Sequence, residues 1–191
     1  METELNSIWP TIQDIQQGNA EKSPIWKAVT HAGQIASVTE GINLPSTQVV
    51  GKALSDNENL KWLLIVGLLP AAETTPESLD ALWSIYRRFE DRLEVKFILP
   101  EQLHNHRPRH NISLVELKDN KWAAWIGSSP SFGIGSVPVE PYLNLWFSVE
   151  GTLLSQFNNY IKTFAAIGVE FTETILQLPR LVLWVGRWGR T

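Results

Sequence analysis

The run LKWLLIVGLL, residues 60–69, is the feature that most restricts what this chain can fold into. Its side chains are almost all apolar, as in a β-strand that is covered on both faces of a sheet. Pro70 ends the run, and the sequence from Thr75 onward predicts an amphipathic helix at residues 77–93 and then a strand at residues 94–99. Two strands joined by a helix of this length favour parallel pairing. We therefore expect a single α/β domain with a mixed sheet flanked by helices.

The remaining segments extend this pattern on both sides. Upstream, short helices are expected within residues 1–22, from Ser23 to Ala32, and from Ser46 onward. Downstream, the expected elements are strands at residues 112–117, 122–126 and 142–149 and a helix at residues 153–166. Residues 167–191 fit a strand or a helix. The predicted organisation is an N-terminal helical segment, residues 1–45, packed on an α/β domain, residues 46–191.

The composition excludes several classes of function. The chain has 191 residues, of which 43% are hydrophobic and 19% charged, as in a globular domain. Because cysteine is absent, disulfides, thiolate nucleophiles and Cys-ligated zinc are excluded. A net charge of −4 argues against a broadly basic nucleic-acid surface but allows a local basic patch. The acidic start and the lack of a long apolar run predict a cytoplasmic protein without a membrane partner, and we expect no cofactor.

A second informative stretch, residues 110–133, has the order of a phosphodiester-handling motif. His110 opens an apolar strand, a polar turn follows, and the next strand ends in Gly127 and Ser128. This order resembles that of the phospholipase D superfamily, whose signature is His-x-Lys-x4-Asp followed by Gly-Ser-x-Asn. The resemblance covers about residues 47–166 and implies one half of a phospholipase D-like fold.

Most residues that this resemblance would make catalytic are replaced. Counting from His110, Ile112 stands at the lysine position, Leu117 at the aspartate position and Pro130 at the asparagine position. The superfamily uses two motifs, in which one histidine attacks phosphorus, the other protonates the leaving oxygen, and lysines stabilise the phosphoryl group. This chain has one motif, so catalysis by His110 would require a homodimer that pairs two copies of it. Ile112 could not supply the missing cation.

The segment before the motif, LHNHRPRH, carries several candidate ligands. Arg107 and Arg109 are candidate anion-binding residues, because guanidinium groups favour phosphate. His104, His106 and His110 are candidate nitrogen ligands of a metal ion. No carboxylate or thiolate at a familiar spacing completes a tetrahedral site, so we interpret the segment as a solvated polar loop and assign no metal.

Two other groups are candidates for binding. Ser128 and Ser129 belong to the Gly/Ser-rich loop that borders the site in the resemblance. The end of the chain combines aromatic and basic side chains, namely Trp184, Arg187, Trp188 and Arg190. Such residues occur at protein interfaces and on platforms that stack single-stranded nucleic acid. A final core strand with its arginines outside explains the same pattern.

These observations favour a non-catalytic phospholipase D-like binding protein that works as a homodimer or as a subunit of a nucleic-acid-processing assembly. Nine tryptophans exceed what one modest core readily buries, which supports an interface. Two alternatives stay open. One is an active phosphodiesterase or nuclease that uses His110 across a homodimer, and the other is an unrelated protein-interaction module.

Overall fold

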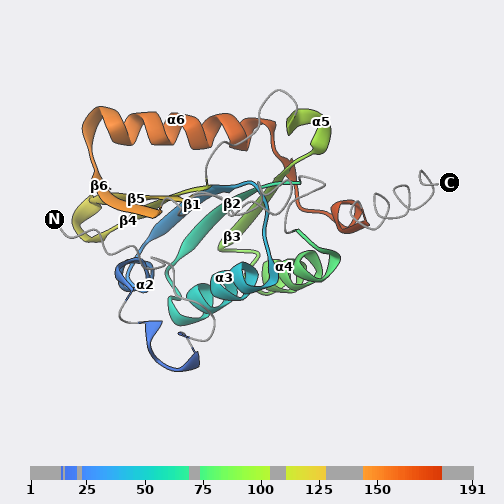
Figure 1. Ribbon diagram of the computed structural model, residues 1–191, viewed down its shortest axis with the longest axis horizontal. Helices are drawn as coiled ribbons and strands as arrows, with labels where there is room; N and C mark the ends of the chain where they lie inside the picture. Colours follow the sequence, from blue (N-terminus) through green and yellow to red (C-terminus); the bar gives the residue numbers. More distant parts are fainter. Residues whose placement is uncertain are drawn as a thin grey trace, which may run out of the picture.

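The computed structural model describes residues 14, 16–20, 23–68, 74–103, 111–127 and 144–177. The centre of this part of the chain is a seven-stranded sheet with the order β6-β5-β4-β1-β2-β3-β7 (Figure 1). The strands are β1 (Gln34–Thr39), β2 (Lys61–Gly67), β3 (Leu93–Ile98), β4 (Asn111–Glu116), β5 (Trp122–Gly127), β6 (Asn144–Val149) and β7 (Val169–Glu170). β1, β2 and β3 are parallel, whereas the other neighbouring pairs are antiparallel.

Helices cover both faces of the sheet. They are α2 (Pro24–Val29), α3 (Leu44–Asp56), α4 (Pro76–Arg88), α5 (Pro100–Leu103) and α6 (Gly151–Ile167), with a 3-10 turn, η2 (Lys118–Asn120). In Figure 1, α3 and α4 lie on one face and α6 lies on the opposite face. The prediction of an α/β domain with a mixed sheet flanked by helices is confirmed.

The β2-α4-β3 unit forms as the sequence predicts. β2 and β3 are parallel neighbours, with Trp62 opposite Leu93. At the start of α4, the Thr75 hydroxyl accepts a hydrogen bond from the Ser78 N–H at 3.2 Å, and the Ser78 hydroxyl accepts one from the Thr75 N–H at 2.9 Å. This reciprocal cap satisfies N–H groups that the first helical turn leaves open. The helix ends at Arg88, earlier than predicted, because Phe89 leaves the helical conformation and Leu93 already pairs in the sheet.

The strand β1 was not predicted, because the sequence analysis places residues 34–39 in a helical N-terminal segment. The helix that precedes β1 ends at Val29, before the predicted Ala32, and the chain then enters the middle of the sheet between β4 and β2. Small and polar residues weaken the apolar signal of this strand. Ser37 is only 5% exposed.

Ser37 is tolerated in the core because its hydroxyl bonds to two other buried side chains, each on a neighbouring strand. The Ser37 hydroxyl lies 2.8 Å from the Ser113 hydroxyl on β4, and it accepts a hydrogen bond from the Trp62 indole N–H on β2 at 3.1 Å. Buried polar groups are stable when they are hydrogen-bonded in this way. The partners lie far away in sequence, so the local pattern of residues 34–39 could not reveal them.

The sheet separates two apolar cores. On one face α6 buries Phe157, Ile161 and Phe164 against β1, β4 and β5. On the other face α2, α3 and α4 pack around Trp62 and Phe97. The predicted strand at residues 142–149 and helix at residues 153–166 are confirmed, with the small differences that β6 begins at residue 144 and α6 extends over residues 151–167.

The segment that the sequence left undecided contains both kinds of element. β7 pairs antiparallel with β3 at one edge of the sheet, and residues 173–177 are helical. The Lys96 ammonium lies 3.1 Å from the Glu170 carboxylate and 3.5 Å from that of Glu94. The pKa of Lys96 is raised above its ordinary value, chiefly by the hydrogen bond to Glu170. The charges of both carboxylates also raise it, whereas partial burial lowers it. Residues 178–191 lie outside the described part.

Candidate site at the carboxyl end of β1

The order of the strands identifies one end of the sheet as the candidate site. From β1 the chain passes to β2 and β3 on one side, and it then returns to the other side of β1 to form β4, β5 and β6. The strand order therefore reverses between β1 and β4. In open α/β sheets, ligands bind outside the carboxyl ends of the strands at such a reversal.

The registers bring several strand ends to the same place. In the antiparallel β1/β4 pair, Val38 lies opposite Ile112, so the end of β1 meets the start of β4. Asn111 at the start of β4 pairs with Gly127 at the end of β5, which in turn pairs with the first residue of β6. The segment that precedes β4 and the segment that follows β5 are consequently joined to one end of the sheet, beside the carboxyl end of β1.

Glu40, the first residue after β1, is the most unusual side chain at this end. It is only 2% exposed, although glutamate is almost never fully buried unless it is paired. Its backbone N–H donates a hydrogen bond to the Asn111 side-chain oxygen at 2.9 Å, which ties the end of β1 to the start of β4. Its burial directly after the central strand makes Glu40 a functional candidate among the described residues.

Two further hydrogen bonds hold the chain that leaves β1. The Thr39 hydroxyl donates to the Gly41 carbonyl at 2.6 Å, and the Ile42 N–H donates to the Thr74 hydroxyl just before α4 at 3.0 Å. Side-chain hydroxyls commonly stabilise turns in this manner. The turn after β1 is thus attached both to β4 and to the chain before α4, so Glu40 has a defined position.

The residues singled out from the sequence all fall outside the described residues. They are His104, His106, Arg107, Arg109, His110, Ser128, Ser129, Pro130, Trp184, Arg187, Trp188 and Arg190. The predicted roles of these residues stay predictions. Two other positions of the signature are described. Ile112, at the lysine position, is 7% exposed and packs in the core under α6, and Leu117, at the aspartate position, precedes η2.

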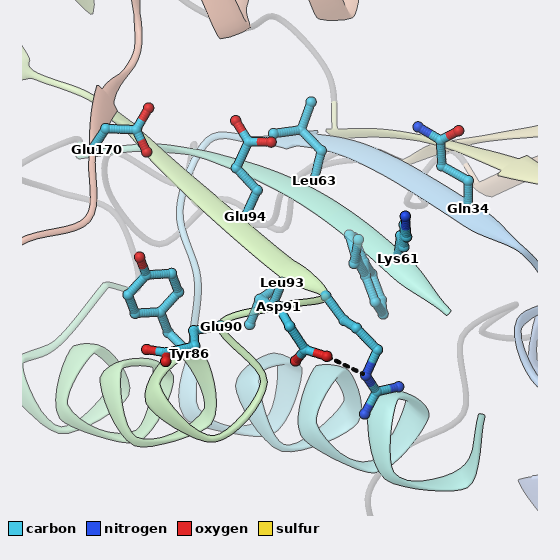
Figure 2. Close-up of a pocket in the computed structure, with 11 residues that line it drawn as sticks. Gln34, Lys61, Leu63, Tyr86, Glu90, Asp91, Leu93, Glu94 and Glu170 are labelled. Atoms are coloured by element: carbon cyan, nitrogen blue, oxygen red, sulfur yellow. Dashed lines mark ion pairs between the residues drawn. The ribbon is translucent and has the colours of Figure 1, made fainter. Parts of the chain in front are cut away.

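The opposite end of the parallel strands carries an open pocket of about 370 Å³. Figure 2 shows Leu63 and Glu94 on one side of the strands and Tyr86 and Glu90 on the other side, where α4 lies. The pocket is lined by Gln34, Lys61, Trp62, Leu63, Tyr86, Glu90, Asp91, Arg92, Leu93, Glu94 and Glu170. Four of these side chains are acidic and two are basic, so the pocket does not favour an anion.

Arg92, one of the two basic residues that line this pocket, has structural partners. The Arg92 guanidinium donates hydrogen bonds to the carbonyls of Leu54 and Asn57 at 3.2 and 2.9 Å, which satisfies the end of α3, and it lies 5.0 Å from the centre of the Phe89 ring. The Asn57 side chain donates to two carbonyls at and after the end of α2, those of Val29 at 3.0 Å and Ala32 at 2.8 Å. Polar groups at the amino end of the strands therefore hold the helices together.

The described ranges lack two features that would bear on function. They contain no cluster of three or more His, Asp or Glu side chains arranged to hold a metal ion. None of the helices described is both long enough and apolar enough to cross a membrane.

Sequence reasoning missed Glu40 because it missed the strand before it. In SVTEG the acidic residue directly follows a buried strand, which is a position where sheet proteins carry functional side chains. The signal was present in the sequence, but it has meaning only when β1 is known to border β4. Comparison of the chain with protein-family models and with curated proteins finds no match.

Proposed function

We propose that the protein is a non-catalytic phospholipase D-like domain that binds the phosphates of a nucleic-acid ligand at the carboxyl end of β1. The observation that carries the proposal is the convergence of β1, β4 and β5 at this end, with the pairs Val38–Ile112 and Asn111–Gly127 in register. This convergence joins the two parts of the signature, which are separate in sequence, to one end of the sheet.

The registers suggest how the signature would meet Glu40. If the β1/β4 pairing continued by two residues, position 110 would lie opposite Glu40, and one further pair between β4 and β5 would bring position 128 beside it. We propose that His110, Arg107 and Arg109 supply the cationic groups that bind phosphate. A buried carboxylate is stable beside an imidazolium or a guanidinium, so these residue types suit the position.

The replacement of the lysine is the reason to propose binding without cleavage. Ile112 is buried in the core under α6, so the position that should stabilise a phosphoryl transition state contributes to packing. Loss of one such donor typically lowers a rate about 10² to 10³-fold. The alternative, a phosphodiesterase that pairs His110 across a homodimer, would need another cation in this place.

A backbone-only probe tests the binding proposal. We would measure the affinity of an abasic deoxyribose-phosphate oligomer by fluorescence anisotropy at several salt concentrations. The double variant R107A/R109A should bind more weakly and should lower the slope of log affinity against log salt by about 1.4, or about 0.7 for each phosphate contact to a single strand. The double variant R87A/R88A removes the same charge from α4 and should leave both quantities unchanged.

A cleavage assay with the same oligomer separates binding from catalysis. We expect that the wild type shows no metal-independent cleavage above the rate of the His110→Ala variant. Turnover that this substitution abolishes would establish the phosphodiesterase alternative. If the wild type does not bind the oligomer at all, the phosphate-binding proposal is wrong and an unrelated interaction module becomes the better interpretation.

We also propose that the protein assembles through the β6 edge with a second copy of itself. Leu145 on β6 and Leu153 at the start of α6 are 37% and 41% exposed, and β6 carries no charged residue. An edge strand without charge or proline favours pairing with another strand. Light scattering at increasing concentration should detect a dimer that Leu145→Lys weakens. Leu44→Lys, at a leucine that is 40% exposed on α3, is the matched control. A monomer at every concentration would refute this assembly.

A further inference from the structure

Asn111 at the start of β4 combines a structural hydrogen bond with a donor group that the described fold leaves unused. Its side-chain oxygen accepts a hydrogen bond from the Glu40 backbone N–H at 2.9 Å, across the two strands that meet at the candidate site. Within the part of the chain that the structure describes, its Nδ2 group has no hydrogen-bond partner. Asn111 is half-buried, so a polar group of this kind at the end of the sheet calls for an explanation.

The hydrogen bond with Glu40 fixes the orientation of this amide. A backbone N–H is a donor, so only the oxygen of the Asn111 side chain can face it, and the NH2 group must point in another direction. Exchange of the two ends by rotation would break the hydrogen bond and bring two donors together. The Asn111 side chain therefore holds two N–H donors in a fixed direction at the carboxyl end of β1.

A second asparagine shows what a purely structural amide does in this fold. At the opposite end of the sheet, the NH2 group of Asn57 donates to the carbonyls of Val29 and Ala32, and the side-chain oxygen of Asn57 accepts from the Asn59 N–H. The fold thus uses both ends of the Asn57 amide. It uses only the oxygen of the Asn111 amide among the described residues. The joining of β1 to β4 therefore explains half of the Asn111 side chain and leaves the donor half to be explained.

The chemistry of an amide NH2 group suits an anionic oxygen at this place. Glu40 is 2% exposed, and a buried carboxylate disfavours a second negative charge beside it unless donors compensate. An amide donor supplies a hydrogen bond without a charge of its own, and a hydrogen bond to a charged acceptor is about twice as strong as one between neutral groups. Asn111 can therefore complement cationic side chains in binding one phosphate.

We infer that Asn111 binds the ligand by donating a hydrogen bond from Nδ2 to a non-bridging phosphate oxygen. This inference rests on the proposed function, because phosphate is the ligand group proposed for the carboxyl end of β1. Asn111 joins β1 to β4 through its oxygen and binds phosphate through its nitrogen. It is a binding residue that the sequence analysis did not select.

Titration of isotopically labelled wild-type protein with the abasic oligomer tests the contact directly. The side-chain NH2 signal of Asn111, assigned through the Cβ atom of the residue, should move downfield in the proton dimension as one N–H bonds to the phosphate. The side-chain NH2 signal of Asn57 is the internal control. It should stay in place, because both of its hydrogen bonds are made at the opposite end of the sheet.

Two substitutions separate the donor from the other properties of Asn111. Asn111→Asp keeps an oxygen that can accept from the Glu40 N–H, and Asn111→Ala adds no charge, so both share only the loss of the NH2 group. Both should weaken binding of the abasic oligomer about 10 to 100-fold, as expected for a hydrogen bond to a charged group. Asn59→Asp and Asn59→Ala, at an exposed position near the amino end of β2, are the matched controls and should leave the affinity unchanged. Thermal melts of every variant accompany the titrations.

Distinct outcomes refute the two proposals. If the wild type binds the oligomer but the Asn111 NH2 signal stays in place, or if a folded variant at position 111 binds as tightly as the wild type, the Asn111 contact is wrong and phosphate binding stands. If the wild type does not bind the oligomer, the phosphate-binding proposal is wrong and the inference falls with it. The wild-type titration decides between these outcomes even if neither variant at position 111 folds.

Discussion

The two ends of the parallel strands differ in what their polar side chains do. At the amino end, Asn57 and Arg92 donate hydrogen bonds to carbonyls of α2, α3 and the loops that follow them, so they satisfy groups that folding would leave open. At the carboxyl end, the buried Glu40 directly follows β1, next to the place where three strand ends converge. The polar side chains at the amino end therefore have a structural role, and we propose that ligand binding is confined to the carboxyl end.

The largest expected effect on stability comes from the amino end. Asn57→Ala removes two hydrogen bonds to the Val29 and Ala32 carbonyls and one from the Asn59 N–H, and should lower the free energy of unfolding by about 3 kcal/mol at roughly 1 kcal/mol each. Urea unfolding measures the change, and Asn59→Ala at the exposed neighbouring position is the control. The ligand affinity of the folded Asn57→Ala protein should stay that of the wild type. A loss below about 1 kcal/mol would contradict the structural role of Asn57.

Glu40→Gln should lower ligand affinity more than the neutralisation of any other carboxylate does. The substitution keeps the size of the side chain but replaces one acceptor oxygen with an NH2 donor and removes the charge that we expect to hold His110 and its basic neighbours. We expect the affinity for the abasic oligomer to fall about tenfold, equivalent to about 1.4 kcal/mol. Glu90→Gln, an exposed carboxylate at the pocket of Figure 2, should have no effect. Equal effects of both substitutions would remove the distinction between the two ends.

Substitution of Lys96 should have the smallest effect on stability. This residue lies on β3, next to the edge strand β7. Because its pKa is raised in the folded state, its stabilisation is fully present below the unfolded pKa of about 10.4 and is lost as the pH rises through the folded value. Lys96→Met should therefore lower stability by no more than about 1 kcal/mol at neutral pH, and the difference from wild type should shrink at higher pH. Thermal unfolding at pH 7 and at a pH above the raised pKa of folded Lys96 checks this. A difference that stays constant with pH would show that the ion pair is not its source.

Local patterns were sufficient to predict the β2-α4-β3 unit. Residues 60–69 are almost continuously apolar, and Thr75, Pro76 and Ser78 form a helix start that depends only on neighbouring residues. β1 could not be predicted in this way, because Ser37 is acceptable in the core only through Ser113 and Trp62. Propensity and periodicity describe a segment, whereas a buried polar network depends on distant partners.

The candidate site was predictable in part, for a related reason. The sequence identified Gly127 as the end of a strand beside the signature, and β5 ends there. It could not reveal that this strand end meets β1, so Glu40 was overlooked. The hydrogen bond between Asn111 and Glu40 was also hidden, because it depends on the register between two strands that a long segment separates.

The central claim is that the ligand binds at the carboxyl end of β1. Backbone amide shifts of isotopically labelled protein, recorded during titration with the abasic oligomer, test it most directly. The account predicts that the largest shifts arise at residues 39–41, 111–112 and 125–127, while the amides of Lys61, Tyr86 and Glu94 around the pocket of Figure 2 stay unchanged. Shifts concentrated around that pocket, or none at the end of β1, would contradict it.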